Sequence, residues 1–314
     1  MTRESHAEDS TALAPDAAFK LLGNETRMDI LQTLGEADGP LSFTELRDRV
    51  GIRQGAQFNY HLDKLVGRFV GKTADGYELT QAGRQINGAI HAGAYTMETT
   101  IEPFPFDVPC PTCGGDRTLS YGDDLVRVDC EDCPAHAQFG VPPSVVVDCD
   151  RDDLPEVAGR YLLTTYQRLT VGFCLFCDGP VRPSVTPFEE TITEVPEDVP
   201  EEVATRLSEV PNVHYDCTRC GVEVTGGLRL SLLYHPAVVC FHHDRGVDVF
   251  DRSVWALAGI HVDRQRIRSR EPFRASVTFA EAGDELTLTV DEDLEVVDLD
   301  VDLDVEGDAD TVES

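Results

Sequence analysis

Long apolar runs are missing from this chain of 314 residues. A membrane-spanning helix needs roughly 20 consecutive apolar residues, and because no run approaches that length, we expect no transmembrane segment. The N-terminal stretch MTRESHAEDST is polar and lacks the apolar core of a secretory signal. The sequence therefore predicts a cytoplasmic protein, in a reducing compartment where paired cysteines favour metal binding over disulfides.

Lysine is also scarce. Only Lys20, Lys64 and Lys72 are lysines among 26 basic residues, and 58 acidic residues bring the net charge to −32. This acid-rich, lysine-poor composition is typical of proteins from salt-accumulating halophiles. In about 1 M salt the Debye length is about 3 Å, so the self-repulsion of such a chain is screened. A partly disordered acidic protein is the alternative, but abundant apolar periodicity favours folded domains.

The chain lacks the usual patterns of an enzyme. It shows no nucleophile–base pair, no glycine-rich phosphate loop and no cofactor fingerprint. We therefore predict no catalytic activity.

Cysteine, in contrast, is abundant, and eight of the ten cysteines form four C-x-x-C pairs. Two thiolates separated by two residues reach one metal ion from a single tight turn, and two such turns complete a tetrahedral zinc shell. We predict two structural zinc ions. The first would be bound by Cys110, Cys113, Cys130 and Cys133, and the second, in a split ribbon, by Cys174, Cys177, Cys217 and Cys220.

Other assignments of these cysteines remain open. His136 and His214 each lie three residues from a pair, so either imidazole could replace a cysteine. Thiol redox chemistry would need one thiol with a depressed pKa, and catalytic zinc would need an open position that four thiolates do not leave. Cys149 and Cys240 stand outside the pairs, and we expect both to be buried.

Charge is distributed unevenly along the chain. Residues 1–100 carry 10 basic and 14 acidic side chains, whereas residues 101–314 carry 16 and 44. Within residues 42–72 the balance is positive, with six basic side chains against three acidic ones. A cationic segment in so acidic a chain points to a polyanion partner there, and the acidic remainder is expected to avoid DNA.

Residues 15–98 have the pattern of a winged helix-turn-helix. Asn24 is a predicted N-cap, and Ser42 with Glu45 predicts a capping box for the next helix, which Gly51 would end. A third helix is expected over residues 55–67, followed by a hairpin that turns at Asp75 and Gly76. The third helix would bury Phe58, Leu62, Leu65 and Val66.

The opposite face of the third helix carries a polar stripe of Gln57, His61, Lys64 and Arg68, which belong to the candidate DNA contacts. In a winged helix this helix enters the major groove and the hairpin touches phosphates. Gln and Asn pair with adenine, Arg pairs with guanine, and exposed cations contact phosphates. The predicted DNA-binding residues are Arg53, Gln54, Gln57, Asn59, Tyr60, His61, Lys64, Arg68 and Lys72. Asn59 and Tyr60 could instead stabilise the domain.

Four segments give this region a specific resemblance. They are LLGNETRMDILQTL (21–34), LSFTELRDRVGI (41–52), FNYHLDKLVGRFV (58–70) and GYELTQAGRQI (76–86). Together they resemble an ArsR-type winged-helix regulator of the haloarchaeal kind. The resemblance implies a homodimer joined by flanking helices, a role that the small-residue stripe of residues 81–98 fits. Residues 43–50 contain no cysteine, so metal sensing at that position of the family is unsupported.

The remaining residues are divided by their composition and periodicity. We expect a linker over residues 101–109, a first zinc ribbon within 108–150, an α+β domain over 151–300 that contains the second ribbon, and an acidic tail over 301–314. The expected elements are helices at 155–170, near 199–208 and from Pro236, a strand pair around Gly226 and Gly227, and strands at 274–279, 285–290 and 294–299. His242 and His243 are expected at the surface.

The sequence thus predicts an α+β fold and a homodimeric transcriptional regulator that binds double-stranded DNA. Its acidic region would hold two structural zinc ions and serve an effector or assembly role, with an effector that the sequence does not identify. One alternative is a zinc-ribbon adaptor that binds proteins of the transcription machinery. Another is a thiol or metal sensor.

Overall fold

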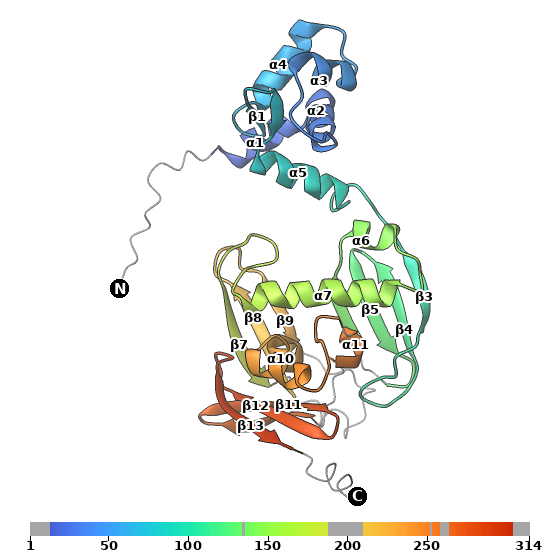
Figure 1. Ribbon diagram of the computed structural model, residues 1–314, viewed down its shortest axis with the longest axis vertical. Helices are drawn as coiled ribbons and strands as arrows, with labels where there is room; N and C mark the ends of the chain where they lie inside the picture. Colours follow the sequence, from blue (N-terminus) through green and yellow to red (C-terminus); the bar gives the residue numbers. More distant parts are fainter. Residues whose placement is uncertain (1–12, 134–135, 188–209, 252, 258–263, 304–314) are drawn as a thin grey trace, which may run out of the picture. The chain divides into compact units, whose positions relative to one another are not determined.

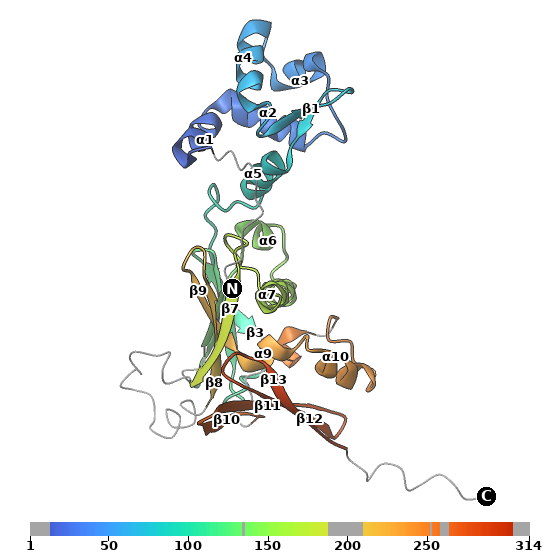
Figure 2. The ribbon, with the colours of Figure 1, turned by 90° about the vertical axis from the view of Figure 1, so that its left-hand side faces the viewer.

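The structure, a computed structural model, describes residues 13–133, 136–187, 210–251, 253–257 and 264–303. It divides into two compact units, Met1–Met97 and Glu98–Ser314. The fold is a mixture of helices and several antiparallel sheets, as predicted (Figures 1 and 2). None of the helices in the described part of the chain is long and apolar enough to cross a membrane.

The first unit is mainly helical and contains one β-hairpin. Its elements are α1 (Pro15–Leu22), α2 (Glu25–Gly35), α3 (Phe43–Val50), α4 (Gly55–Leu65), β1 (Val70–Lys72), β2 (Tyr77–Leu79) and α5 (Gln81–His91). The hairpin pairs Val70 with Leu79 and Lys72 with Tyr77. Helix α1 was not predicted, and α5 ends at His91, well before residue 98.

Local capping explains where these helices start and stop. The side chain of Asn24 accepts a hydrogen bond from the amide of Arg27 at 3.3 Å. Ser42 and Glu45 form the predicted capping box, with reciprocal bonds of 3.3 and 3.0 Å. Gly51 ends α3 in the left-handed region, at a φ of 79°, which glycine adopts without steric cost.

We predict that Ser42→Ala weakens the start of α3 by about 1 kcal/mol, because one orphan amide loses its acceptor. Hydrogen exchange in the peptide that contains α3 should accelerate, while exchange in the second unit should not change. Thr44→Ala, at an exposed position of the same turn, is the matched control. Equal effects of the two substitutions would contradict the capping account.

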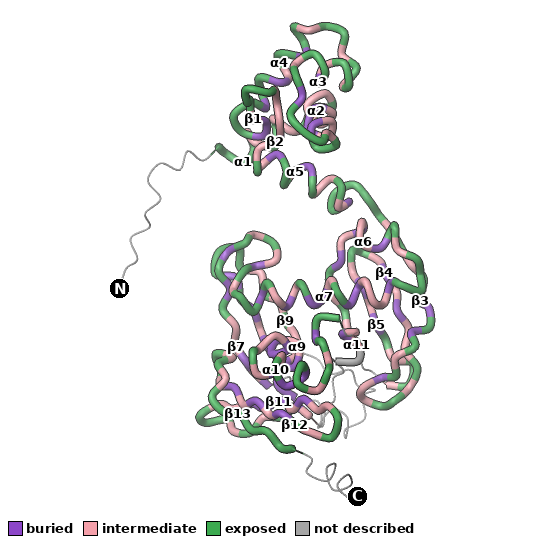
Figure 3. Tube along the Cα trace, viewed as in Figure 1, coloured by how far each residue is buried: buried purple, intermediate pink, exposed green. Residues whose placement is uncertain are grey.

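The core of the first unit lies between α2, α3, α4 and the hairpin (Figure 3). Its buried residues are Ile30, Leu31, Leu34, Leu41, Leu46, Phe58, Leu62, Leu65, Phe69, Val70 and Leu79. Val66 was wrongly predicted to be buried. It is 36% exposed, because its backbone is already extended at the end of α4.

The second unit contains three antiparallel sheets. The first has the order β3-β4-β5-β6, the second β7-β8-β9 and the third β10-β11-β12-β13. The strands are β3 (Ile101–Phe106), β4 (Arg117–Gly122), β5 (Leu125–Cys130), β6 (His136–Gly140), β7 (Val181–Pro187), β8 (Pro211–Cys217), β9 (Glu223–Gly227), β10 (Gln265–Arg270), β11 (Phe273–Glu281), β12 (Asp284–Val290) and β13 (Val296–Asp302). The helices are α6 (Pro143–Val147), α7 (Leu154–Thr170), α9 (Leu228–Leu232), α10 (Pro236–His243) and α11 (Val254–Leu257).

Residues 101–109 are not simply the linker that their prolines indicated. Ile101–Phe106 form the edge strand β3, in which Phe104 pairs with Leu119 of β4. Phe104 and Phe106 alternate into the core. Proline is tolerated at positions 103 and 105 because one side of an edge strand makes no ladder hydrogen bonds.

Helix α7, predicted at residues 155–170, connects the two cores of the second unit. Leu154 and Ala158 belong to the core of the first sheet, whereas Leu163 and Tyr166 belong to the core shared by the second and third sheets. Figure 1 shows α7 running from the first sheet to the second. The two cores are therefore joined through one continuous helix.

Other predictions for the second unit were partly correct. The helix from Pro236 and the strands β11, β12 and β13 are confirmed, whereas β10, α6 and α9 were missed. The strand pair at Gly226 and Gly227 was wrong: β9 ends there and α9 follows. A Cβ on Gly226 would lie 2.0 Å from the Tyr166 hydroxyl, so close approach, and not a hairpin turn, requires this glycine. The helix expected near 199–208 and residues 304–314 of the expected tail lie outside the described residues.

Candidate metal centres and polar helix face

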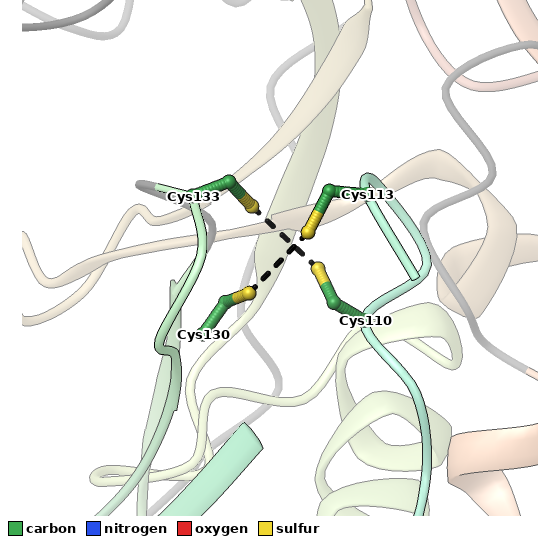
Figure 4. A group of neighbouring side chains, drawn as sticks. All are labelled: Cys110, Cys113, Cys130 and Cys133. Carbon is green, nitrogen blue, oxygen red and sulfur yellow. Dashed lines mark hydrogen bonds between the residues drawn. The ribbon is translucent and has the colours of Figure 1, made fainter. Parts of the chain in front are cut away.

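The first cysteine group brings four sulfurs together from two turns. Cys110 and Cys113 precede β4, Cys130 ends β5 and Cys133 precedes β6. The sulfurs of Cys110 and Cys133 are 3.7 Å apart, and those of Cys113 and Cys130 are 3.5 Å apart. Figure 4 shows all four sulfurs pointing toward a common centre.

The second cysteine group has the same arrangement. Cys174 and Cys177 precede β7, Cys217 ends β8 and Cys220 precedes β9. The sulfurs of Cys174 and Cys220 are 3.7 Å apart, and those of Cys177 and Cys217 are 3.4 Å apart. In each group the four ligand atoms lie within 4.8 Å of one another.

These distances fit a metal ion and do not fit disulfides. A disulfide would place two sulfurs about 2.05 Å apart. A zinc–sulfur bond of about 2.3 Å puts the sulfurs of a tetrahedral site about 3.8 Å apart, close to the observed spacing. Both groups could therefore hold a metal ion, and the eight predicted cysteines are the residues that would bind it.

Two copies of one structural module carry the two groups. In each copy a strand starts seven residues after the first cysteine, the third cysteine ends the next strand, and another strand starts three residues after the fourth cysteine. The amide of the first cysteine also donates to the carbonyl five residues later, at 2.9 Å in both copies. Matching positions are Cys110 and Cys174, Arg117 and Val181, Cys130 and Cys217, and His136 and Glu223.

Each group contains one thiol that ionises readily. Desolvation raises the pKa of Cys110, but hydrogen bonds from the amides of Cys113 and Thr112 outweigh it and lower the pKa to about 7. The amide of Cys220 helps to lower the pKa of Cys217 to about 6, whereas desolvation raises that of Cys177 to about 12. Since adjacent thiolates repel one another, a bound cation is needed to ionise all four, and its binding would release protons.

Neither candidate histidine belongs to a metal group, because both groups consist of cysteines only. His136 is exposed at the start of β6.

The Nδ1 atom of His214 lies 2.6 Å from Glu223, and its Nε2 atom lies 2.9 Å from Thr186. The Thr186 hydroxyl, the His214 imidazole and the Glu223 carboxylate thus follow one another in the same order as the groups of a hydrolase catalytic triad. Since they come from neighbouring strands of one sheet, cross-strand pairing accounts for their contact.

Three further predictions need correction. Cys240 is exposed rather than buried, because α10 turns Val238, Phe241 and His242 inward instead. Cys149 is only partly buried. His242, expected at the surface, is 1% exposed, with Nδ1 lying 2.9 Å from the carbonyl oxygen of Val238.

The candidate DNA contacts in the first unit lie at the surface. Arg53, Gln54, Gln57, Asn59, Tyr60, Lys64, Arg68 and Lys72 are exposed, and His61 is half-buried. Since α4 ends at Leu65, Arg68 follows the helix and does not extend its face. Lys72 is the last residue of β1, on the hairpin.

Some of these side chains already make contacts within the first unit, and others do not. The Asn59 amide donates to Asp63 at 2.7 Å, so it is already bonded. The Lys64 ammonium lies 5.5 Å from the centre of the Tyr60 ring, which fits the expectation that Tyr60 supports its neighbours. The Nδ1 atom of His61 is buried and has no hydrogen-bond partner among the described residues. Gln57 and Lys64 are therefore exposed and available to a ligand, as are Arg53, Gln54 and Arg68.

Comparison with known families gives two matches. Residues 15–90 are similar to a family described as a domain of unknown function (DUF7347). Residues 107–296 match a second family, and this match includes all eight paired cysteines. Comparisons with curated proteins and with solved structures found no match. Because the second match covers more than half of the chain, the protein belongs to the family described as a domain of unknown function (DUF7351).

Proposed function

We propose that the protein is a homodimeric transcriptional regulator that binds double-stranded DNA through its first unit. The order of that unit is helix, turn, helix and hairpin, from α3 through β2, which is the order of a winged helix-turn-helix. The resemblance to ArsR-type regulators supports the same assignment. In this proposal α4 enters the major groove and the hairpin contacts the backbone.

The single observation that carries the proposal is the exposed polar face of α4. Gln57 and Lys64 are seven residues apart, about two turns, so they share one side of the helix. Phe58, Leu62 and Leu65 occupy another side of the helix, about 80–140° from Gln57, and are fully buried. The buried side of α4 therefore packs against the core, and this packing holds Gln57 and Lys64 in one orientation at the surface.

Each exposed side chain fits a particular DNA contact. Gln57 has the donor and acceptor pair that reads adenine in the major groove, and Arg53 has the fork that reads guanine. Lys64, Arg68 and Lys72 supply cations for phosphates. In the molar salt that the composition indicates, counterion release contributes little to binding, so base contacts and half-site spacing would determine affinity.

Exposed apolar side chains on the first unit support dimerisation. Phe19 on α1 is 72% exposed, and none of the residues of α1 is buried. Tyr95, beyond the end of α5, is 85% exposed. The predicted stripe of residues 81–98 is only partly available, because Ala82 and Ile86 pack against the core of their own unit. A second copy would therefore be contacted through α1 and the later part of the stripe.

The second unit would hold two structural zinc ions and act as an effector or assembly region. Its cysteine groups leave no open coordination position for a substrate, which disfavours catalytic zinc. Its acidic composition would keep it away from the DNA backbone. We propose a cytoplasmic location, because paired cysteines that bind a metal suit a reducing compartment.

Selection of DNA from a pool of random duplexes tests this function. The full-length protein, loaded with zinc at about 1 M salt, should enrich a sequence with two related half-sites and protect both from cleavage. Enrichment of one unrepeated site would contradict the dimer. Failure to enrich any sequence, or binding that falls with salt above about 1 M as steeply as for a basic repressor, would contradict the proposed mode of binding.

A second candidate function, an adaptor that binds proteins of the transcription machinery, is favoured by one observation. Phe173 and Phe176, beside the second cysteine group, are 53% and 72% exposed. The matching positions of the first module are Pro109 and Thr112, so the module does not need these phenylalanines in order to fold. Loss of a protein partner upon Phe176→Ala, with DNA binding unaffected, would support this function.

A further inference from the structure

Arg117, the first residue of β4, lies beside the first cysteine group. It pairs with Cys130 across the strands. Its Nε atom donates to the carbonyl of Val108 at 2.7 Å, and its guanidinium lies over the Phe106 ring, 4.6 Å from the ring centre. The Trp255 ring is 6.0 Å away. These contacts fix the guanidinium in one place.

The charge of Arg117 is not balanced by a carboxylate. Arg117 forms no ion pair with an acidic side chain of the described residues, and its buried Nη2 atom has no hydrogen-bond partner among them. The residue opposite it on the neighbouring strand is Cys130, one of the four sulfur ligands. Because a partly buried cation without a counter-charge is unfavourable, the thiolates are its natural partners.

The second cysteine group lacks this arginine. The matching position in β7 is Val181, a buried apolar residue. Two arginines do lie near the group, but Arg168 already pairs with Asp178 and Arg219 donates to the carbonyl of Cys177 at 3.2 Å. Both are exposed, so salt and water weaken their effect on the sulfurs.

We infer that Arg117 is the counter-cation of the first metal–thiolate centre, and that the two centres therefore hold a divalent metal unequally. Four thiolates around a divalent ion leave an excess of negative charge, which a fixed, half-buried guanidinium offsets. The first centre keeps its metal, and the second centre releases its metal first when a chelator or thiol reagent competes. This inference rests on the metal occupancy proposed above.

Alkylation of the zinc-loaded, full-length protein in the presence of excess EDTA tests the inference. Peptide mass spectrometry then gives a separate rate for the cysteines of each group. In the wild type, Cys174, Cys177, Cys217 and Cys220 should be alkylated before Cys110, Cys113, Cys130 and Cys133. In Arg117→Gln the rate for the first group should rise at least about tenfold, with the second group unchanged.

Two further variants separate charge from packing. Arg117→Lys keeps the cation and should retain most of the protection of the first group. Arg151→Gln is the matched control, because Arg151 also lies over a phenylalanine, Phe104 at 4.5 Å, and donates to a main-chain carbonyl of β3. It should leave both rates unchanged.

Three different results would contradict the inference, and each can be told apart from the others. Release from the first group before the second in the wild type contradicts it, and this result needs no variant to fold. Equal alkylation rates for the first group in Arg117→Gln and in the wild type also contradict it. That result would leave the proposed metal occupancy unaffected. A protein that binds no metal when loaded would remove the metal occupancy and this inference together.

Discussion

Removal of the metal is expected to unfold the sheets of the second unit while the helices of the first unit persist. Each site joins two turns that precede or end the strands β4 to β9, so its loss frees both ends of a hairpin. A structural zinc site contributes on the order of 10 kcal/mol of apparent folding free energy. That is comparable to the roughly 5–15 kcal/mol stability of a whole domain.

Hydrogen exchange measures this effect in each unit separately. A chelator should remove the protection of β4, β5, β7 and β8, and α2 and α4 should keep theirs because their core contains no cysteine. Cys130→Ser should reduce the metal content from two ions to one, and it should remove the hydrogen-exchange protection of the first sheet. Cys240→Ser, which changes an exposed cysteine outside both groups, is the control. Unchanged protection of the sheets after complete metal removal would contradict the structural role.

Joint substitution of Gln57 and Lys64 is expected to weaken specific DNA binding strongly without changing the metal content. Gln57→Ala should relax the preference at one base pair by about 1–3 kcal/mol. Lys64→Ala should weaken binding almost equally for all sequences. The two effects should add, because one residue reads a base and the other contacts a phosphate.

Arg160→Ala provides the control, since Arg160 is an exposed cation of α7, outside the first unit, that pairs with Glu156 at 3.3 Å. Its removal should change neither the affinity nor the preferred sequence. Titration of labelled duplexes at constant salt gives each affinity, and elemental analysis gives the metal content. Unaltered binding by the Gln57 and Lys64 variants would favour the adaptor function.

Much of the first unit could be predicted from local sequence patterns, each only a few residues long. The capping residues Asn24 and Ser42 and the turn glycine Gly51 fixed the helix boundaries correctly. The burial of Phe58, Leu62 and Leu65 and the exposure of the polar positions of α4 other than His61 were also predicted correctly, because helical spacing alone decides which residues share a side. Arg68 was misplaced because the helix ends before it, at a stop signal that the prediction overlooked: Gly67 follows the C-cap Val66 and adopts a φ of 92°.

The second unit was less predictable because its structure depends on contacts distant in the sequence. The spacing of the cysteines predicted both groups, since chelation itself constrains the spacing. Two zinc ribbons were predicted, but the matching of their strands was not, because the interval between the cysteine pairs grows from 16 to 39 residues. The role of Arg117 was also missed. It depends on Phe106 and Trp255, which only the folded chain brings to the guanidinium.

Chromatin mapping of the tagged protein in its own host tests the central claim most directly, because it reports DNA recognition at the native salt concentration. We expect discrete peaks at a limited set of promoters, each with paired half-sites, and we expect them to disappear with the Gln57 and Lys64 substitutions. A uniform signal across the genome would contradict the account. So would peaks that the doubly substituted protein retains.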